Sequence, residues 1–214
     1  MQSQSKRISS VDFFAVLGLP RTPWIDADRL KAHYLEIARQ SHPDQAEEPE
    51  SKQAPNQPDS ATVNEAYQVL GNDVTRLVHF LALETGHDTA QERDVPKQLV
   101  DVFMGLSPLF HEADQTIQLL RVEQTPILRA NHYLSATPLL TSLSDASTKL
   151  SALAGVARTH LQTVAQAWLD LPVSENGQQR DAILTDLRDT YRTLSFLQRW
   201  QNNIAERSFE LTPS

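Results

Sequence analysis

The sequence contains no cysteine, and this absence removes several kinds of chemistry from the chain. Without a thiol there is no disulfide, no thiolate metal site and no cysteine nucleophile. Proteins without cysteine fit a reducing compartment. Residues 1–9 are polar and lack the hydrophobic core of a signal peptide, so we expect a cytoplasmic protein.

Positive charge and glycine are also scarce. The chain has 19 Lys and Arg against 27 Asp and Glu, which gives a net charge of -8. Proteins that bind nucleic acids or anionic membranes cluster Lys and Arg, so neither partner is expected. No apolar run approaches the roughly 20 residues that span a bilayer. With only 6 glycines and no glycine-rich phosphate loop, we do not expect nucleotide binding.

What the sequence does contain is helical periodicity, because apolar residues recur at spacings of three and four while strand-like alternation is rare. We therefore predict an all-α protein. A short helix is expected over residues 12–17, with Gly18 as its stop, and a second over residues 26–41. A third begins near Ser60, and a fourth runs from about Asp73 to Gly86. The predicted inward residues are Leu30, Tyr34, Ile37, Ala38, Ser41, Val63, Ala66, Tyr67, Leu70, Val74, Leu77, Phe80 and Leu81.

These helices form one predicted domain, residues 9–86, in which the second and third helices are expected to lie antiparallel as a hairpin, and a helical bundle is predicted over residues 87–214. Residues 45–59 are rich in Glu, Gln and Pro without apolar residues and predict a mobile loop. In the bundle, Ser107 and Pro108 resemble the start of a helix. Two longer apolar stripes predict an antiparallel pair with coiled-coil-like packing: Leu139, Leu143, Ala146, Leu150, Leu153, Ala157, Leu161, Val164 and Trp168, and then Leu184, Leu187, Tyr191, Leu194, Leu197 and Ile204.

The segment His42-Pro43-Asp44 stands where the second helix must stop. Pro43 disfavours helical angles at His42 and stiffens the turn, so an imidazole and a carboxylate project from a rigid corner. Such a carboxylate suits a bidentate contact with a partner's arginine. Lys31, Leu35 and Arg39 follow at intervals of four and predict an outward stripe that meets an acidic partner. For the three residues alone, a solvated turn is the better interpretation.

The sequence around these three residues favours a binding role over a solvated turn, because the chain resembles a J-domain. The J-domain is the module that recruits and stimulates DnaK-type chaperone ATPases. The matching segments are "DFFAVLGLP" at residues 12–20, "HPD" at residues 42–44 and "NEAYQVL" at residues 64–70. The text "TRLVHFLALETG" at residues 75–86, with Arg76, resembles the HscB type, the co-chaperone of iron–sulfur cluster assembly.

This resemblance implies a non-enzymatic co-chaperone that binds a DnaK- or HscA-type ATPase through His42, Pro43 and Asp44, with Arg29, Lys31, Leu35 and Arg39 in the docking surface. It also implies an IscU-type scaffold protein as the client of the bundle. No cofactor is expected, since cluster ligation belongs to the scaffold. Two segments, "PKQLVDVFMGLSPLF" and "TLSFLQRW", resemble the parts of the family sequence that contact the scaffold. In the family an acidic run follows the first of these segments, and that run is absent here. The two segments give four candidate residues, Leu99, Val100, Phe103 and Phe196, for which core packing stays an alternative.

Three further interpretations stay open at this point. The chain is a J-domain protein with an unrelated client, or a helical structural or oligomerising protein with an incidental HPD segment. Residues 124–155, which have no counterpart in the HscB pattern, and the long stripes favour these alternatives. His111, Glu112 and Asp114 suggest a metal site, but without H-E-x-x-H spacing a solvated helix face is the better interpretation.

Overall fold

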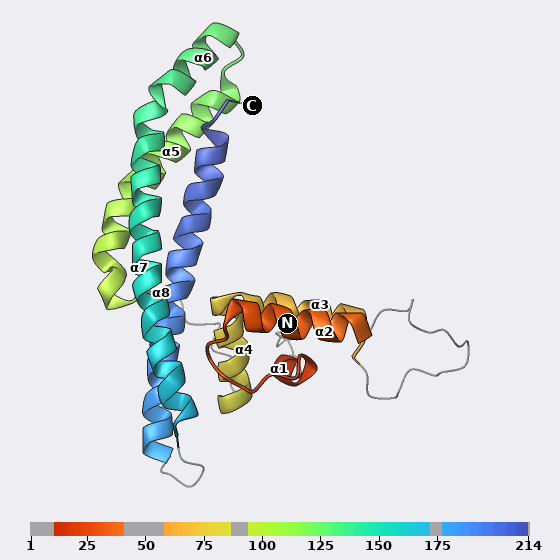
Figure 1. Ribbon diagram of the computed structural model, residues 1–214. Coiled ribbons are helices and arrows are strands. Elements are labelled where there is room, and N and C mark those ends of the chain that lie inside the picture. Colours follow the sequence, from red (N-terminus) through yellow and green to blue (C-terminus); the bar gives the residue numbers. More distant parts are fainter. Residues whose placement is uncertain (1–10, 41–57, 87–93, 172–176, 214) are drawn as a thin grey trace, which may run out of the picture. The chain divides into compact units, whose positions relative to one another are not determined.

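The computed structural model describes residues 11–40, 58–86, 94–171 and 177–213, and every regular element in these ranges is a helix (Figure 1). The all-α prediction is therefore confirmed. The chain divides into two compact units. The first takes in residues 1–92 and Leu161–Tyr191, and the second takes in Arg93–His160 and Arg192–Ser214.

The first unit contains α1 (Phe13–Val16), α2 (Ala27–Gln40), α3 (Ser60–Gly71) and α4 (Asp73–Thr85). Short polar side chains start these helices. The Asp12 carboxylate accepts the Phe14 N–H at 3.0 Å, and the Asn72 amide oxygen accepts the Val74 N–H at 2.9 Å. The Gly86 residue ends α4 at φ 70°, a left-handed conformation that glycine adopts without strain.

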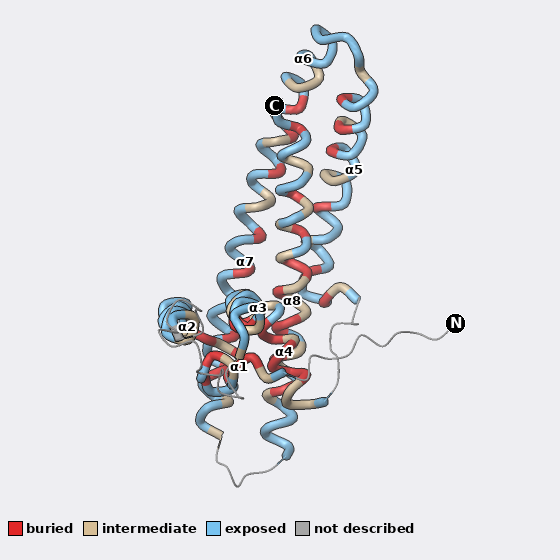
Figure 2. The backbone as a smooth tube through the Cα atoms, turned by 90° about the vertical axis from the view of Figure 1, so that its right-hand side faces the viewer, coloured by how far each residue is buried: buried red, intermediate tan, exposed pale blue. Residues whose placement is uncertain are grey.

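Seven of the thirteen predicted inward residues are buried in the core of this unit. Large side chains of α1, α3 and α4 or their ends are fully buried in this core: Phe14, Leu17, Leu70, Leu77, Phe80 and Leu81. Phe14 and Leu17 were not among the predicted inward residues. Figure 2 marks the buried positions of the chain in red. Leu30 of α2 and Val63 and Ala66 of α3 belong to the same core. The other predicted inward residues in the described ranges are only half-buried: Tyr34, Ile37, Ala38, Tyr67 and Val74. Ser41 lies outside the described residues.

Two long helices continue from one unit into the other, α7 (Thr137–Leu169) and α8 (Gly177–Glu210). The C-terminal end of α7 and the N-terminal part of α8 belong to the first unit. The edge of the Trp168 ring contacts the Phe80 ring with centroids 5.2 Å apart, and the Arg180 guanidinium donates to the Glu84 carboxylate at 2.5 Å. The structure groups Leu161–Tyr191 with the first unit, so its two units are not two consecutive stretches of the chain. The division into domains at residues 9–86 and 87–214 stays a prediction.

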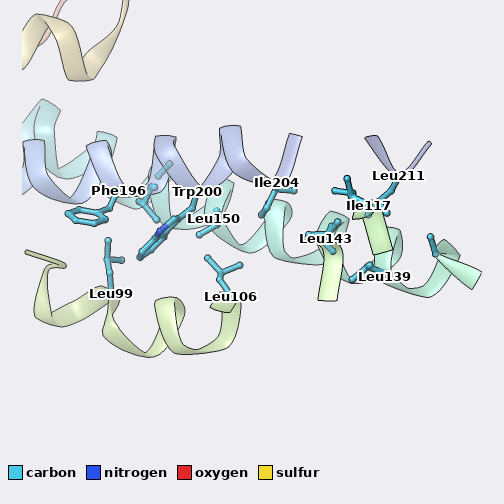
Figure 3. Packing of buried hydrophobic residues seen from close by; sticks show 14 of the residues in the cluster. Leu99, Leu106, Ile117, Leu139, Leu143, Leu150, Phe196, Trp200, Ile204 and Leu211 are labelled. Atoms are coloured by element: carbon cyan, nitrogen blue, oxygen red, sulfur yellow. The ribbon is translucent and has the colours of Figure 1, made fainter. Parts of the chain in front are cut away.

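The second unit contains the 3₁₀ helix η2 (Lys97–Leu99), α5 (Val100–Val122), α6 (Pro126–Ser135) and the remaining parts of α7 and α8. Side chains from α5, α7 and α8 meet in one core, where Leu99 and Leu106 point toward Trp200 and Leu150 (Figure 3). The six residues of the predicted α8 stripe are all buried. Most of the predicted α7 stripe is buried or half-buried, but Leu153 is 37% exposed.

The prediction of a new helix at Ser107 and Pro108 was wrong, because α5 continues through both residues. Proline inside a helix removes one hydrogen bond and crowds the preceding turn. Here both residues lie on the exposed side of α5, while Leu106, Ala113 and Ile117 pack along the other side. Core packing on both sides of Pro108 therefore holds the helix together. No helix in the described ranges is long and apolar enough to cross a membrane.

A buried arginine joins three segments of the first unit. The Arg76 side chain is 3% exposed, and its Nε donates to the Pro23 carbonyl at 3.0 Å. Nη1 donates to the Leu70 carbonyl at 2.7 Å, and Nη2 forms an ion pair with Asp73. The planar guanidinium thus holds the loop between α1 and α2 against the junction of α3 and α4.

Replacing this arginine should destabilise the first unit. Arg76→Leu leaves two carbonyls without their donor and the Asp73 carboxylate without its ion pair, so we expect a loss of about 3 kcal/mol in the free energy of unfolding. Urea denaturation followed by circular dichroism measures this change. Arg29→Leu, at an exposed position of the same unit, is the matched control and should change the value by less than about 0.5 kcal/mol. Equal losses in the two variants would contradict the role given to Arg76.

His79 makes the stability of the same unit depend on pH. The Phe13 N–H donates to its Nε2 at 3.1 Å, so the ring is neutral. Burial lowers the pKa of His79, which the Asp12 carboxylate opposes and Arg21 reinforces. The unfolded chain therefore binds a proton more readily than the folded one. The contribution of neutral His79 to the free energy of unfolding is complete above about pH 6.5. It is lost as the pH falls from there toward the lowered pKa of His79.

Urea denaturation at pH 7.5 and 5.5 should show this loss. His79→Gln has no titrating ring, so its free energy of unfolding should change less between the two pH values than that of the parent. A parent protein whose stability is unchanged over this interval would contradict the assignment.

Candidate functional site

The candidate site begins with the placement of α2, which three contacts determine. The His33 Nδ1–H donates to the Leu17 carbonyl at 3.1 Å, which ties α2 to the end of α1. The Tyr34 hydroxyl donates to the Asn64 side chain at 2.8 Å, and its ring stacks on Tyr67 with centroids 4.3 Å apart. These contacts fix both the position of α2 and its rotation about its own axis.

The contacts also show that α2 and α3 form an antiparallel hairpin. Leu30, near the start of α2, lies beside Gly71 at the end of α3, while Tyr34 meets Tyr67 and Asn64 earlier in α3. Figure 1 shows the two helices side by side. The predicted antiparallel arrangement of the helices that flank the HPD segment is therefore confirmed. His42, Pro43 and Asp44, like the predicted loop at residues 45–59 up to residue 57, lie outside the described residues.

The side of α2 that faces away from α3 carries the predicted stripe. Lys31, Leu35 and Arg39 are all exposed, and Leu35 keeps 42% of its surface in solvent. At 3.6 residues per turn, the three side chains fall within about 80° of one another around the helix. The stripe therefore joins two cations and an apolar side chain on one surface, leading toward the end of α2 that precedes His42.

Arg29 is exposed as well, but it does not belong to this stripe. It lies about 120° around the helix from Leu35. It lines a separate cleft of about 410 Å³ in the first unit, together with Trp24, Gln162 and Gln166. The structure thus brings Lys31, Leu35 and Arg39 together and separates Arg29 from them.

The four candidate residues for scaffold binding fall into two pairs. Leu99 is 2% exposed and Phe196 is 6% exposed, and both belong to the core of the second unit. This burial agrees with the core packing that the sequence analysis kept as an alternative for both residues. Val100 and Phe103 are 43% and 42% exposed, so they are available at the surface of α5.

Phe103 rests on an aromatic support that the sequence analysis did not identify. Its ring stacks on Trp200 with centroids 6.1 Å apart, and Trp200 in turn contacts Phe196 at 5.7 Å. Trp200 is buried. The signal for it was present, because Trp200 continues the spacing of three and four between Leu197 and Ile204. The buried pair of α8 therefore holds Phe103 in an exposed position.

The segment around His111 is a helix face and not a cluster of ligands. Ala113 is buried in the core, and the Asp114 carboxylate pairs with Arg207 at 2.9 Å. His111 Nε2 contacts the Gln115 amide at 2.9 Å. Among the described residues, no group of three or more His, Cys, Asp or Glu side chains is arranged to hold a metal ion.

Comparison with known proteins agrees with this geometry. The DnaJ domain family matches residues 12–79. The co-chaperone protein HscB of Proteus mirabilis is 37% identical over 84 residues, which cover 39% of this chain and 48% of that protein. The chain thus matches about half the length of this curated relative.

A solved structure of similar fold extends the likeness over the rest of the chain. The chaperone HscB from Vibrio cholerae superposes with a TM-score of 0.54, covering 94% of this chain and 100% of the other, at 19% sequence identity. At this identity the likeness concerns the fold. Residues 12–79 therefore match the DnaJ domain family, and the fold of the chain is similar to that of a chaperone HscB.

Proposed function

We propose that this protein is a co-chaperone that stimulates the ATPase of a DnaK- or HscA-type chaperone. The observation that carries the proposal is the exposed stripe of α2, held on an antiparallel hairpin whose connection contains His42, Pro43 and Asp44. Two cations around an apolar side chain suit a partner surface that is acidic with an apolar centre. The J-domain match over residues 12–79 supports the same partner class.

The role of the hairpin follows from its rigidity. The aromatic stack of Tyr34 on Tyr67 and the buried Leu30 fix α2 against α3, so a chaperone that docks on Lys31, Leu35 and Arg39 meets a preformed surface. Pro43 restricts the backbone between His42 and Asp44, which limits the directions in which both can project. We infer that docking on the stripe brings this corner against the ATPase and promotes hydrolysis there. The protein itself catalyses no step.

We further propose that the second unit delivers an IscU-type scaffold protein that carries a nascent iron–sulfur cluster. Val100 and Phe103 are exposed candidate residues in the segment at residues 96–110 that resembles the scaffold-contacting part of the HscB sequence. Trp200 holds the ring of Phe103 at the surface. An aromatic side chain fixed at the surface loses little conformational freedom on binding, which favours it as an anchor. Leu99 and Phe196 act from the core, where they support this surface.

The alternative of a J-domain protein with an unrelated client keeps one specific observation in its favour. Helix α6 (Pro126–Ser135) lies in the segment without a counterpart in the HscB pattern and has no buried residue, and its Ile127 and Leu134 are 74% and 72% exposed. The two clients are distinguished by the scaffold-binding experiment below.

Stimulation of the ATPase tests the chaperone partner. His42→Gln should abolish the stimulation of a DnaK-family chaperone from the same host in single-turnover ATP hydrolysis, because it removes the imidazole of the His42-Pro43-Asp44 segment. The circular dichroism should stay helical. The control His111→Gln changes an exposed histidine of the second unit and should stimulate like the parent. A His42→Gln variant that stimulates fully would refute the proposal.

The same assay separates the two basic positions of α2. Arg39→Glu should weaken stimulation, most clearly at low salt, because it places a carboxylate in the stripe. Arg29→Glu reverses the same charge outside the stripe and should have a smaller effect. Equal effects would show that overall charge, and not the stripe, governs docking.

Scaffold binding tests the client. Phe103→Ser should weaken binding of the host's IscU-type scaffold at least tenfold in isothermal titration calorimetry, because it removes the exposed aromatic anchor. Ile127→Ser changes an equally apolar, more exposed side chain of α6 and should leave the affinity unchanged. If the parent shows no binding at micromolar concentrations while ATPase stimulation persists, the client is unrelated.

A further inference from the structure

The second unit has an apolar groove that the proposed function does not use. It lies between α5 and α7, encloses about 780 Å³, and has Leu106 and Leu150 among its lining residues, both almost fully buried. Leu153 and Val156 continue its apolar lining along α7 and are 37% and 70% exposed. These exposed side chains belong to a helix face that no described element covers.

This groove is separate from the proposed scaffold surface. On α5, Phe103 lies about 60° to one side of the buried Leu106, while the groove residue Leu109 lies about 60° to the other side. Phe103 contacts Trp200 of α8, whereas Leu109 faces α7 across the groove. One helix therefore presents two surfaces on opposite sides of its buried edge.

Small side chains keep the groove open. Gly105 of α5 and Ser142, Ala146 and Ala152 of α7 all line it. A Cβ atom added at Gly105 would meet no other heavy atom within 4 Å, so the space beside this residue is empty. The lining residues of α7 extend from Ser142 to Val156, which corresponds to about 21 Å, or four turns of helix.

Each wall of the groove carries a carboxylate. Asp101 lines the groove on α5 and Asp145 lines it on α7. Both are exposed, and within the described ranges neither side chain forms an ion pair or a hydrogen bond. Lys149 lies one turn beyond Asp145 and gives the lining its single positive charge, so the groove keeps a negative excess.

We propose that this groove binds an amphipathic helix of another protein, with an apolar face and Lys or Arg on both sides of that face. The apolar face would cover Leu106, Leu150 and Leu153, as helices do in hydrophobic grooves. Basic residues on its two sides would meet Asp101 on one wall and Asp145 on the other. A helix of about 15 residues matches the length of the groove.

A designed peptide tests the proposal with the full chain. The probe is a 15-residue helical peptide of about this groove length, with leucines on one face and lysines on both sides, capped at its ends and carrying a fluorophore. Fluorescence anisotropy should show saturable binding at micromolar concentration. A peptide with glutamates in place of the lysines should bind about tenfold more weakly. Asp101→Asn and Asp145→Asn should each weaken binding of the lysine peptide about threefold.

Two glycine variants provide the matched pair. Gly105→Leu fills the groove and should abolish binding, whereas Gly155→Leu introduces the same side chain at an exposed position of α7 outside the groove and should bind like the parent. Circular dichroism confirms that both variants are folded. The proposal is overturned if the lysine peptide does not bind, if both peptides bind equally, or if Gly105→Leu binds like the parent.

Sedimentation at several concentrations gives the remaining outcome. A parent that forms a dimer, which Gly105→Leu dissociates and Gly155→Leu does not, would assign the groove to a second copy of this chain and overturn the assignment to a partner helix. A parent that remains a monomer while binding the lysine peptide agrees with the proposal. None of these measurements depends on the ATPase partner or on the scaffold, so failure here leaves the proposed function to its own tests.

Discussion

The buried guanidinium of Arg76 is the interaction on which the geometry of the candidate site depends. It donates to the carbonyls of Pro23 and Leu70 and pairs with Asp73, so one side chain satisfies groups from a loop and from two helices. A buried charge is stable only with such partners. The loop that Arg76 holds leads directly into α2. The direction in which α2 presents its exposed stripe therefore follows from this contact, together with the ring of Tyr34 on Tyr67.

The ends of the two long helices complete the same unit. Glu84 of α4 accepts from Arg180 of α8 and lies 3.9 Å from Arg21, which itself pairs with Asp12. The Arg180 guanidinium also lies over the Trp168 ring, 5.4 Å from its centroid. Because an ion pair with a partly exposed arginine contributes little on its own, we expect apolar burial to stabilise this junction more. Leu161 and Leu187 are fully buried there, and Trp168 contacts Phe80. The J-domain region and the ends of α7 and α8 thus share one folded unit.

The second unit shows how one core produces surfaces of different character. Leu106 of α5 is buried, and the residues on its two sides diverge: Phe103 stacks on Trp200, while Leu109 faces the groove toward α7. A helix in a small bundle buries only a stripe, and its flanks stay available for partners. An aromatic support makes one flank a fixed anchor. Small residues and two carboxylates make the other flank an open, acidic groove.

The sequence by itself determined the all-α class, most of the helices, much of the core and the resemblance to a J-domain, since these depend on local periodicity and on short motifs. It also placed Lys31, Leu35 and Arg39 on one stripe. Tertiary structure alone decided that Leu99 and Phe196 are buried while Val100 and Phe103 are exposed. Spacing shows which residues share a helix face, but it does not show which other helix, if any, covers that face. Tertiary packing also decided that α5 continues through Pro108, because the buried side chains on both sides of this proline outweigh its local tendency to end a helix. Contacts between residues distant in sequence decided that residues 161–191 belong to the first unit.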